Sequence, residues 1–301
     1  MENKVNTIID SAKCIGCGKC VMVCPSETIS MLDGKATITG KTSVNCGHCE
    51  QVCPVDAIKV TSLTELSFET FDADTNCLPP GESDTSQLVR LMASRRSCRN
   101  YTDQTVDRSM LEDLVKVGTT APSGTNCQEW NFTILPERKD VVVYGNYIVD
   151  FFHKINKLAN NSLFRNTMSF FGKKDFKIFY HNYSSFIGKA VSNWYSGEHD
   201  YLFYGAPALI IVGCSDACSM PMDDALLASQ NIQLAAHSMG LGTCLIGFAV
   251  KAMDHDRKIC AKIGVKPSEK YYSVIAVGWP DEQYKHVCNR KAVSPRYPVL
   301  T

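Results

Sequence analysis

The stretch "CIGCGKCVMVCP" at residues 14–25 sets four cysteines at the spacing C-x2-C-x2-C-x3-C and ends in Cys-Pro. A second stretch, "SVNCGHCEQVCP" at residues 43–54, repeats this spacing, except that Ser43 stands where the first stretch has Cys14. Three thiols on one tight loop can hold three irons of a cubane cluster, while the fourth thiol points away and ligates a neighbouring cluster. The two stretches therefore predict a pair of iron–sulfur sites, the second of which lacks one thiol.

Structural zinc is the simpler alternative, because zinc also binds C-x2-C pairs, but the seven thiols within residues 14–53 exceed one tetrahedral site. Residues 1–62 resemble the two-cluster bacterial-type ferredoxins, with seven of the eight expected cysteines. The resemblance implies two 4Fe-4S clusters and one-electron transfer at low potential. Crossed ligation assigns to the first cluster Cys14, Cys17, Cys20 and Cys53, and to the second Cys24, Cys46, Cys49 and the position of Ser43.

Ser43 makes the second cluster atypical. A serine alkoxide is a harder and poorer ligand for iron than a thiolate. Three states stay open: a serine-ligated cluster, a cluster open at one iron, and a labile three-iron form. Recruitment of Cys77 by a local rearrangement is a further alternative, for which the sequence carries no positive sign.

The remaining composition is that of an ordinary globular chain. It has 301 residues, of which 45% are hydrophobic, and a formal net charge of zero, which gives no reason to expect nucleic acid as a partner. Fifteen cysteines in a chain without an apolar signal peptide argue against a disulfide framework. No apolar stretch reaches the length needed to span a bilayer. We therefore expect a cytoplasmic protein that does not bind membranes.

An acidic segment divides the chain. Residues 63–85 contain six acidic residues and no Lys or Arg, and "LPPG" at 78–81 breaks regular structure. We predict a ferredoxin-type domain at 1–62, a linker at 63–85 and a larger domain at 86–301. In the first domain, Asp33-Gly34 indicates a β-hairpin and "AIKVTS" after Cys53 indicates a strand.

The larger domain mixes helical and strand patterns. Helical spacing marks "TSQLVRLMASR", "DRSMLEDLVKVG" and residues 222–239, and Asp107 is a candidate N-cap. Buried strands are predicted at "WNFTIL", "PALIIV" and "YSVIAV". Residues 144–204 read as irregular and aromatic-rich, and their rings could cover a flat ligand or pack an inserted helical pair.

A cluster of arginines marks one candidate binding segment. "SRRSCRNY" at residues 94–101 gathers three guanidiniums around a hydroxyl, which suits a phosphate group. A solvated basic helix end explains the same residues without a ligand.

Two further segments carry weaker signals of their own. The polar turn "APSGTNCQEW" at 121–130 offers amides that suit the rim of a planar ring, although Pro, Ser, Gly and Asn also make plain loops. "MGLGTCLIG" at 239–247 follows a helix, so it is not a Rossmann fingerprint. A helix C-cap explains Gly240, whereas Gly242 indicates backbone lying close to a ligand.

In this order, the three segments resemble the nitroreductase family of FMN flavoproteins from about residue 86 to the end. The matching patterns are R-R-S-x-R, P-S-x-x-N-x-Q and G-x-G, followed by "VGWP" at 277–280 and a basic pair. The resemblance implies that the phosphate and ribityl chain of FMN are held by Arg95, Arg96, Ser97, Arg99, Arg290 and Lys291. It implies that the isoalloxazine is bordered by Pro122, Ser123, Asn126, Gln128, and the 240–247 loop with Gly240 and Gly242.

The same resemblance implies an intertwined homodimer with FMN at the subunit interface, and it leaves open which subunit supplies Asn126 and Gln128. The expected fold class is α+β, with the small two-cluster ferredoxin domain followed by a nitroreductase-like α/β domain whose mixed central sheet is flanked by helices. No catalytic side chain is assigned, because the flavin carries the chemistry.

The expected function is an FMN-dependent oxidoreductase that passes electrons from the clusters to FMN and on to a nitroaromatic or quinone-like acceptor. The donor would be a low-potential ferredoxin-type pathway or NAD(P)H. An NAD(P)H-dependent flavin reductase with vestigial clusters is one alternative. A non-catalytic redox sensor or electron carrier is another.

Overall fold

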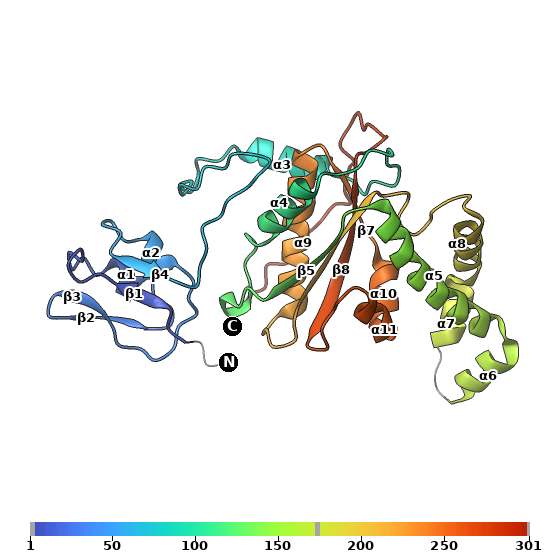
Figure 1. Cartoon of the computed structure of the whole chain (residues 1–301), viewed down its shortest axis with the longest axis horizontal. Helices are drawn as coiled ribbons and strands as arrows, with labels where there is room; N and C mark the ends of the chain where they lie inside the picture. Colours follow the sequence, from blue (N-terminus) through green and yellow to red (C-terminus); the bar gives the residue numbers. More distant parts are fainter. Residues whose placement is uncertain (1–3, 172–174, 300–301) are drawn as a thin grey trace.

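Two short antiparallel strand pairs organise the N-terminal part of the chain (Figure 1). The computed structural model describes residues 4–171 and 175–299, so residues 1–3 of the predicted 1–62 range and parts of the 86–301 range lie outside the described residues. The elements are β1 (Thr7–Ile9), α1 (Lys19–Met22), β2 (Ile29–Leu32), β3 (Lys35–Ile38), α2 (His48–Gln51) and β4 (Ile58–Val60). β1 pairs with β4, and β2 pairs with β3 across Asp33-Gly34, which confirms the predicted hairpin and strand.

The two cysteine loops repeat one backbone conformation. Gly18 and Gly47, with φ angles of 72° and 80°, lead into α1 and α2 respectively. The thiols of Cys24 and Cys53 each accept the backbone N–H four residues later, at 3.4 and 3.2 Å. Short helices, hairpin and loops enclose a small core, in which three of the cysteines are themselves buried.

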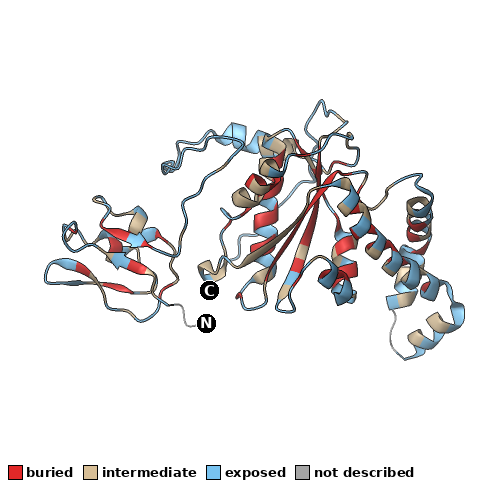
Figure 2. Ribbon diagram, in the orientation of Figure 1, coloured by how far each residue is buried: buried red, intermediate tan, exposed pale blue. Residues whose placement is uncertain are grey.

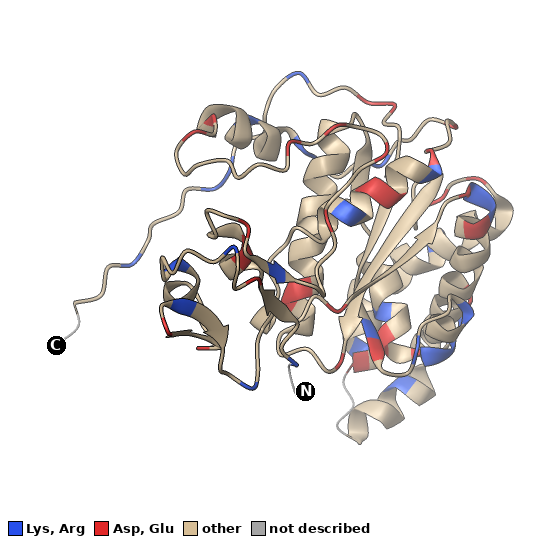
Figure 3. Cartoon of the chain, turned by 60° about the vertical axis from the view of Figure 1, so that its left-hand side comes forward, with Lys and Arg blue, Asp and Glu red and all other residues tan. Residues whose placement is uncertain are grey.

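An extended strap joins this part to the rest of the chain, with no helix or strand between β4 and α3 (Thr85–Ser94) (Figures 1 and 3). The strap is anchored on α4 (Arg108–Gly118) by Asp113, whose Oδ2 accepts the N–H groups of Glu69 and Thr70 at 2.8 and 2.7 Å. Burial alone would raise the pKa of Asp113, but hydrogen bonds from Lys116, Thr70 and Glu69 lower it to about 2. The acidic strap is therefore tied to the larger part at a buried carboxylate.

The larger part is built on a four-stranded sheet. Its strands are β5 (Trp130–Leu135), β6 (Ala208–Ser215), β7 (Gly242–Leu245) and β8 (Glu269–Gly278), in the order β5-β6-β8-β7. Each neighbouring pair is antiparallel, and a parallel bridge joins Ser97 to Thr243 at the β7 edge. The predicted strands are confirmed. Residues 242–245, which the sequence indicates as a loop, are instead an edge strand, because they pair with residues 275–278 of β8.

Helices cover both faces of this sheet (Figure 2). On one face, α4 and α9 (Pro221–Ser238) pack against Ala208, Ile210 and Val212 of β6. On the other face, α5 (Arg138–Asn160), α10 (Gly247–His255) and α11 (Arg257–Lys262) pack against the alternate residues. Successive side chains of β6 thus enter opposite cores, as a central strand buried on both faces requires. The fold is α+β, as expected.

The aromatic-rich stretch is helical, so its interpretation as irregular is wrong. Beyond α5 it forms α6 (Ser162–Phe170), α7 (Asp175–Asn182) and α8 (Ser184–Ser196). The helices pair through their rings: Phe152 and Phe186 both contact Phe248 of α10. A Cβ at Gly145 would lie 2.3 Å from the Trp194 ring, so glycine lets α5 and α8 approach closely. Ring contacts between these helices stabilise them, and the local sequence pattern does not reveal such contacts.

Candidate functional site

The first cysteine loop forms a small cavity lined by Cys14, Cys17, Cys20 and Cys53. Cys53 comes from the second motif and reaches the cavity of the first, so the structure brings together the four residues predicted for the first cluster. Backbone N–H groups of Ala36 and Gly16 point at the Cys14 thiol and lower its pKa. Such N–H donors favour a thiolate and offset the negative charge of a bound cluster.

The second cysteine loop forms the matching cavity, whose lining includes Cys24, Ser43, Cys46 and Cys49. Ser43 is buried, and its Oγ accepts the N–H of Asn45 at 3.0 Å. Cys77 is exposed on the strap and does not line this cavity. Ser43 therefore lines the same cavity as three cysteines from two different motifs, and its role as a ligand stays a prediction. The first cavity thus has four thiols in its lining, and the second has three thiols and a serine.

The arginine segment lies at the end of α3, next to β7. Cys98 N donates to Thr243 O at 2.9 Å, which fixes the segment along the edge strand. Arg95 is half-buried, and its pKa is lowered first by burial and then by repulsion from Arg96 and Arg290. The structure thus brings the C-terminal Arg290 to the arginine segment. Every charged residue in the tail from 283 to 299 is basic (Figure 3).

A cavity of about 350 Å³ opens beside Arg96, and Glu282 also lines it, whereas Arg95 and Arg290 do not. Arg96, Gly240 and Gly242 line it, together with His237 of α9 and residues 284–287 of the tail. Gly240 has a φ of 83° and follows the end of α9, as predicted for a C-cap. A Cβ on Gly242 would lie 2.7 Å from the Cβ of Cys98, so the close neighbour of Gly242 is this cysteine. Burial raises the pKa of Cys98 to about 11, which keeps it a neutral packing group.

The P-S-x-x-N-x-Q segment lies at the opposite end of the sheet. It precedes β5, whose Trp130 is opposite Cys214, and Cys214 is opposite Lys270 near the start of β8. The arginine segment instead borders Thr243, which is opposite Val277 near the end of β8. Seven residues of strand separate these levels, roughly 23 Å. The two predicted sets of flavin contacts are therefore not brought together within one chain.

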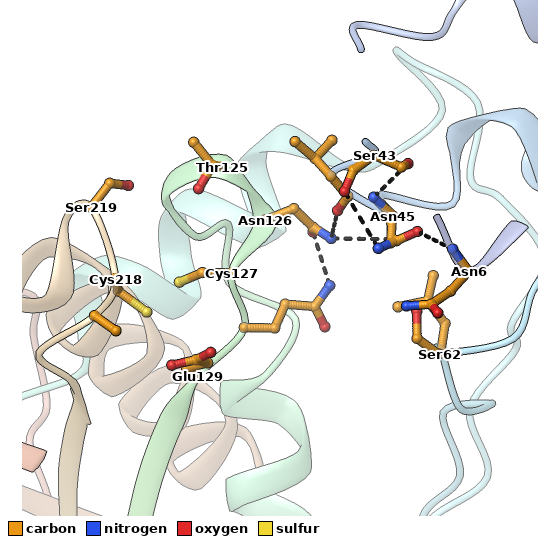
Figure 4. Close-up of a pocket in the computed structure, with 14 residues that line it drawn as sticks. Asn6, Ser43, Asn45, Ser62, Thr125, Asn126, Cys127, Glu129, Cys218 and Ser219 are labelled. Atoms are coloured by element: carbon orange, nitrogen blue, oxygen red, sulfur yellow. Dashed lines mark hydrogen bonds between the residues drawn. The ribbon is translucent and has the colours of Figure 1, made fainter. Parts of the chain in front are cut away.

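Residues 123–128 form a tight loop that contacts the second cysteine loop (Figure 4). The loop includes the 3-10 turn Gly124–Asn126, and Ser123 Oγ accepts the N–H of Gln128 at 3.1 Å. Asn126 Nδ2 donates to the carbonyl oxygens of Val44 and Asn45 at 3.0 and 3.2 Å. Gln128 Nε2 donates to Asn126 Oδ1 at 2.9 Å. Pro122, by contrast, is exposed.

The two parts of the chain enclose a larger cavity of about 560 Å³ at this contact. One wall is the second cysteine loop with Ser43, Val44 and Asn45, and the other is residues 125–129 with Ala217–Ser219 (Figure 4). A cavity shared by a predicted cluster loop and a predicted flavin-bordering loop is a suitable place for a redox cofactor or its substrate.

Sequence reasoning missed several lining residues. His237 lies in the last turn of α9, and its pKa is lowered first by burial and then by Arg95. His237 precedes Gly240 by three residues, so the G-x-G segment could have been extended backwards to include it. The Oγ1 of Thr243 is buried and has no hydrogen-bond partner within the described ranges. Lys291 is exposed on the tail, and among the described residues no ion pair joins it to another side chain.

Among the described residues, no helix has the length and apolar character that crossing a membrane requires.

Two family models match the chain. The nitroreductase family model matches residues 92–279, which is more than half of the chain, and the 4Fe-4S dicluster domain model matches residues 13–57. A 4-nitrobenzoate reductase of Nocardioides sp. is 23% identical over 220 residues, which cover 68% of this chain and 85% of that protein. Ferredoxin-2 of Desulfomicrobium norvegicum is 58% identical over 31 residues, which cover 10% of this chain and 52% of that protein.

A solved nitroreductase of Bacteroides fragilis with bound FMN is 22% identical, covers 72% of this chain and 100% of its own, and superposes with a TM-score of 0.47. The two family models agree with the two observed parts of the fold, the helix-flanked sheet and the paired cysteine loops. The chain belongs to the nitroreductase family, and a ferredoxin-type 4Fe-4S dicluster domain precedes its family domain.

Proposed function

We propose that the chain is an FMN-dependent oxidoreductase that passes electrons from its iron–sulfur clusters to FMN and on to a nitroaromatic or quinone-like acceptor. Membership of the nitroreductase family supports the class of reaction, and the 4-nitrobenzoate reductase relative supports the class of acceptor. When bound, FMN supplies the redox chemistry, accepting electrons singly and delivering them in pairs. The residues of this chain bind and orient the cofactors.

The arginine segment fits the phosphate of FMN. Arg96 and Arg290 lie close enough to Arg95 to repel its guanidinium, and the ion pairs among the described residues join other side chains. A cluster of unpaired guanidiniums calls for an anion, and a phosphate can accept several charge-assisted hydrogen bonds at once. Ser97 lies beside Thr243 at the β7 edge, whereas the Arg99 guanidinium lies over the Tyr204 ring, 5.7 Å from its centroid. Lys291 stays a prediction.

A second copy of the chain completes the flavin site in this proposal. The Asn126 loop lies at the far end of the sheet from Arg95, so it reaches a flavin only on another subunit. Helices α3 and α9 contact each other and leave apolar side chains exposed, namely Leu88, Val89, Met92, Met222, Leu226 and Leu227. Burying such a face in a homodimer is favourable.

The contact between Asn126 and the second cysteine loop carries the proposal. Asn126 donates to Val44 and Asn45, the two residues that follow Ser43 at the cluster position. The loop proposed to border the flavin therefore lies directly against the loop proposed to hold the second cluster. In the homodimer, electrons would pass from the second cluster of one subunit to the FMN bound by the arginines of the other.

Subunit complementation tests this route. Two variants of the full chain, Cys46→Ser and Arg95→Ala, are expected to lose ferredoxin-driven nitroaromatic reduction when each is prepared alone and anaerobically. In the mixed dimer, the Arg95→Ala subunit keeps its clusters and the Cys46→Ser subunit keeps its flavin. We expect mixed dimers, co-expressed and isolated through two different tags, to regain nitroaromatic reduction when reduced ferredoxin is the donor.

The outcomes separate the alternatives. Mixed dimers that stay inactive, although they contain iron and FMN, would contradict electron transfer between subunits. Undiminished ferredoxin-driven turnover in Cys46→Ser homodimers, with NAD(P)H equally effective, would mean that the clusters are vestigial. A Cys77→Ser dimer is the matched control, because Cys77 is an exposed thiol on the strap, and it is expected to behave as the wild type.

A further inference from the structure

Three thiols and a carboxylate converge at the foot of the Asn126 loop, outside both cysteine motifs. The donor atoms of Cys127, Cys214, Cys218 and Asp224 all lie within 4.8 Å of one another. They come from four segments: the loop before β5, the end of β6, the turn after it, and the first turn of α9. Cys127 and Cys218 also line the cavity between the two parts of the chain (Figure 4).

We propose that these four side chains bind a single tetrahedral zinc ion. Tetrahedral zinc holds sulfur at about 2.3 Å and oxygen at about 2.0 Å, which sets its donors about 3.8 Å apart. The four donor atoms, all within 4.8 Å of one another, lie close to that separation. In the described part of the chain, the cysteines of the two cluster loops form no such close group, as expected for thiols that each bind a different iron. The spacing therefore favours one ion over a third cubane.

The carboxylate distinguishes a metal site from a packed group of thiols. Asp224 is only 2% exposed, and no ion pair among the described residues involves it. The start of α9 offers it only partial positive charge. Burying a carboxylate among sulfur atoms is costly without a cation, whereas a cysteine cluster that merely filled space would need no carboxylate. A divalent cation supplies the missing charge.

The surroundings already orient the carboxylate as an outer shell orients a metal ligand. Asp224 Oδ1 accepts the N–H of Gly124 at 2.8 Å, and Oδ2 accepts a hydrogen bond from the Cys127 thiol at 3.3 Å, so Oδ2 is directed at this sulfur. Trp130 Nε1 donates to the backbone oxygen of Asp224 at 3.0 Å and fixes the start of α9. Partners of this kind hold a ligand in one geometry before the ion arrives.

The ion would fasten the loop that meets the second cluster loop. Cys127 directly follows Asn126, so a bond from Cys127 to zinc anchors the loop whose amide contacts Val44 and Asn45. Thr125, Asn126 and Gln128 all have positive φ angles, between 50° and 55°. A loop in this conformation needs outside support, which the zinc site provides.

Zinc, iron, sulfide and FMN are measured together in the full-length protein, purified anaerobically after growth with zinc. We expect one zinc per chain, and an X-ray absorption spectrum at the zinc edge with three sulfurs and one oxygen. Cys218→Ser and Asp224→Asn are expected to lose the zinc and keep the iron, sulfide and FMN. Asp224→Asn preserves shape, so it tests the site even if Cys218→Ser does not fold.

Two variants serve as controls. Cys260→Ser removes a buried thiol in α11 that donates to Met253 O, and it is expected to retain zinc. Cys46→Ser is expected to lose iron but not zinc, which separates this site from zinc misplaced in a cluster loop. Zinc that is absent from the wild type, or equal in wild type and Cys218→Ser, would overturn the proposal. So would a disulfide among the three cysteines, found by mass spectrometry after thiol alkylation.

Discussion

At matching positions, the two cysteine loops have the same backbone but different surroundings. Cys14 and Ser43 are equally buried, each 8% exposed, and the residues two positions later, Gly16 and Asn45, both have positive φ. The first loop packs under the β2–β3 hairpin, where a Cβ on Gly16 would lie 2.2 Å from Gly34 O. The second loop faces the nitroreductase domain, where Val44 and Asn45 accept the Asn126 amide.

The two loops therefore differ in what surrounds them. The loop with four thiols packs against the hairpin of its own small domain, and Ile15 and Cys17 remain exposed. The loop with a hydroxyl lies at the contact with the larger domain, where its neighbours are polar and come from elsewhere in the chain. The departure from the ligand pattern therefore falls on the cluster that we propose faces the flavin.

Cys53→Ala should have the largest effect on this comparison. It removes a thiol that the second motif contributes to the first cavity. A core this small depends on its metal centre, so we expect loss of the iron of the first cluster and unfolding of residues 4–62. Iron analysis and hydrogen exchange of the full chain measure both. Cys77→Ala is the control, and retention of full iron by Cys53→Ala would show that the loops do not exchange ligands.

Gly16→Ala tests how closely the first loop packs against the β2–β3 hairpin. The added methyl meets the backbone oxygen of Gly34, which cannot move without distorting the hairpin. We expect destabilisation of the small domain by roughly 3 kcal/mol or more. Gly18→Ala is the matched control, because Gly18 also has positive φ but has open space around it, and its cost should be about 1 kcal/mol. Equal losses in chemical denaturation would contradict the tight packing of the first loop.

Asp113→Ala tests the tether that keeps the second loop near the larger domain. It leaves the N–H groups of Glu69 and Thr70 without their acceptor, at a cost of about 2 kcal/mol in holding the strap. Hydrogen exchange of these two amides should accelerate. Glu112→Ala, which removes an exposed neighbour paired with Arg108, should leave them protected.

The same anchor has a defined pH dependence. The pKa of Asp113 is lowered to about 2 in the folded chain, below the value of about 4 in an unfolded one. Its stabilisation is therefore complete above pH 4 and is lost as the pH falls toward 2. Protection of the Glu69 and Thr70 amides that did not change between these pH values would contradict the role of Asp113.

Ser43→Cys should have the smallest effect, and its result decides whether residue 43 lies at the second cluster. It restores the fourth thiol, so we expect the spectrum of the second cluster to change and the iron content to rise by at most about one ion per chain. Ser62→Cys is the control, because Ser62 lines the cavity between the two parts but not the second cysteine cavity. If Ser43→Cys leaves both iron content and spectrum unchanged, Ser43 is not at the cluster.

The sequence by itself determined the local elements. Cysteine spacing, the Asp33-Gly34 turn and the apolar strands are short-range patterns, and each appears in the fold where its pattern lies. The family also followed from residue order, because R-R-S-x-R, P-S-x-x-N-x-Q and G-x-G are local signals. Two local predictions failed: residues 242–245 form a strand through pairing with β8, and the described part of 144–204 is mostly helical, with ring contacts between helices.

Only the tertiary structure decided which distant residues meet. It placed Arg95 and Asn126 at opposite ends of one sheet, a separation that motif order does not reveal. It also brought Cys127, Cys214, Cys218 and Asp224 together, although no ligand spacing in the sequence announces them. Local patterns report backbone periodicity within a few residues, whereas these sites depend on strand pairing and helix packing between segments far apart in the chain.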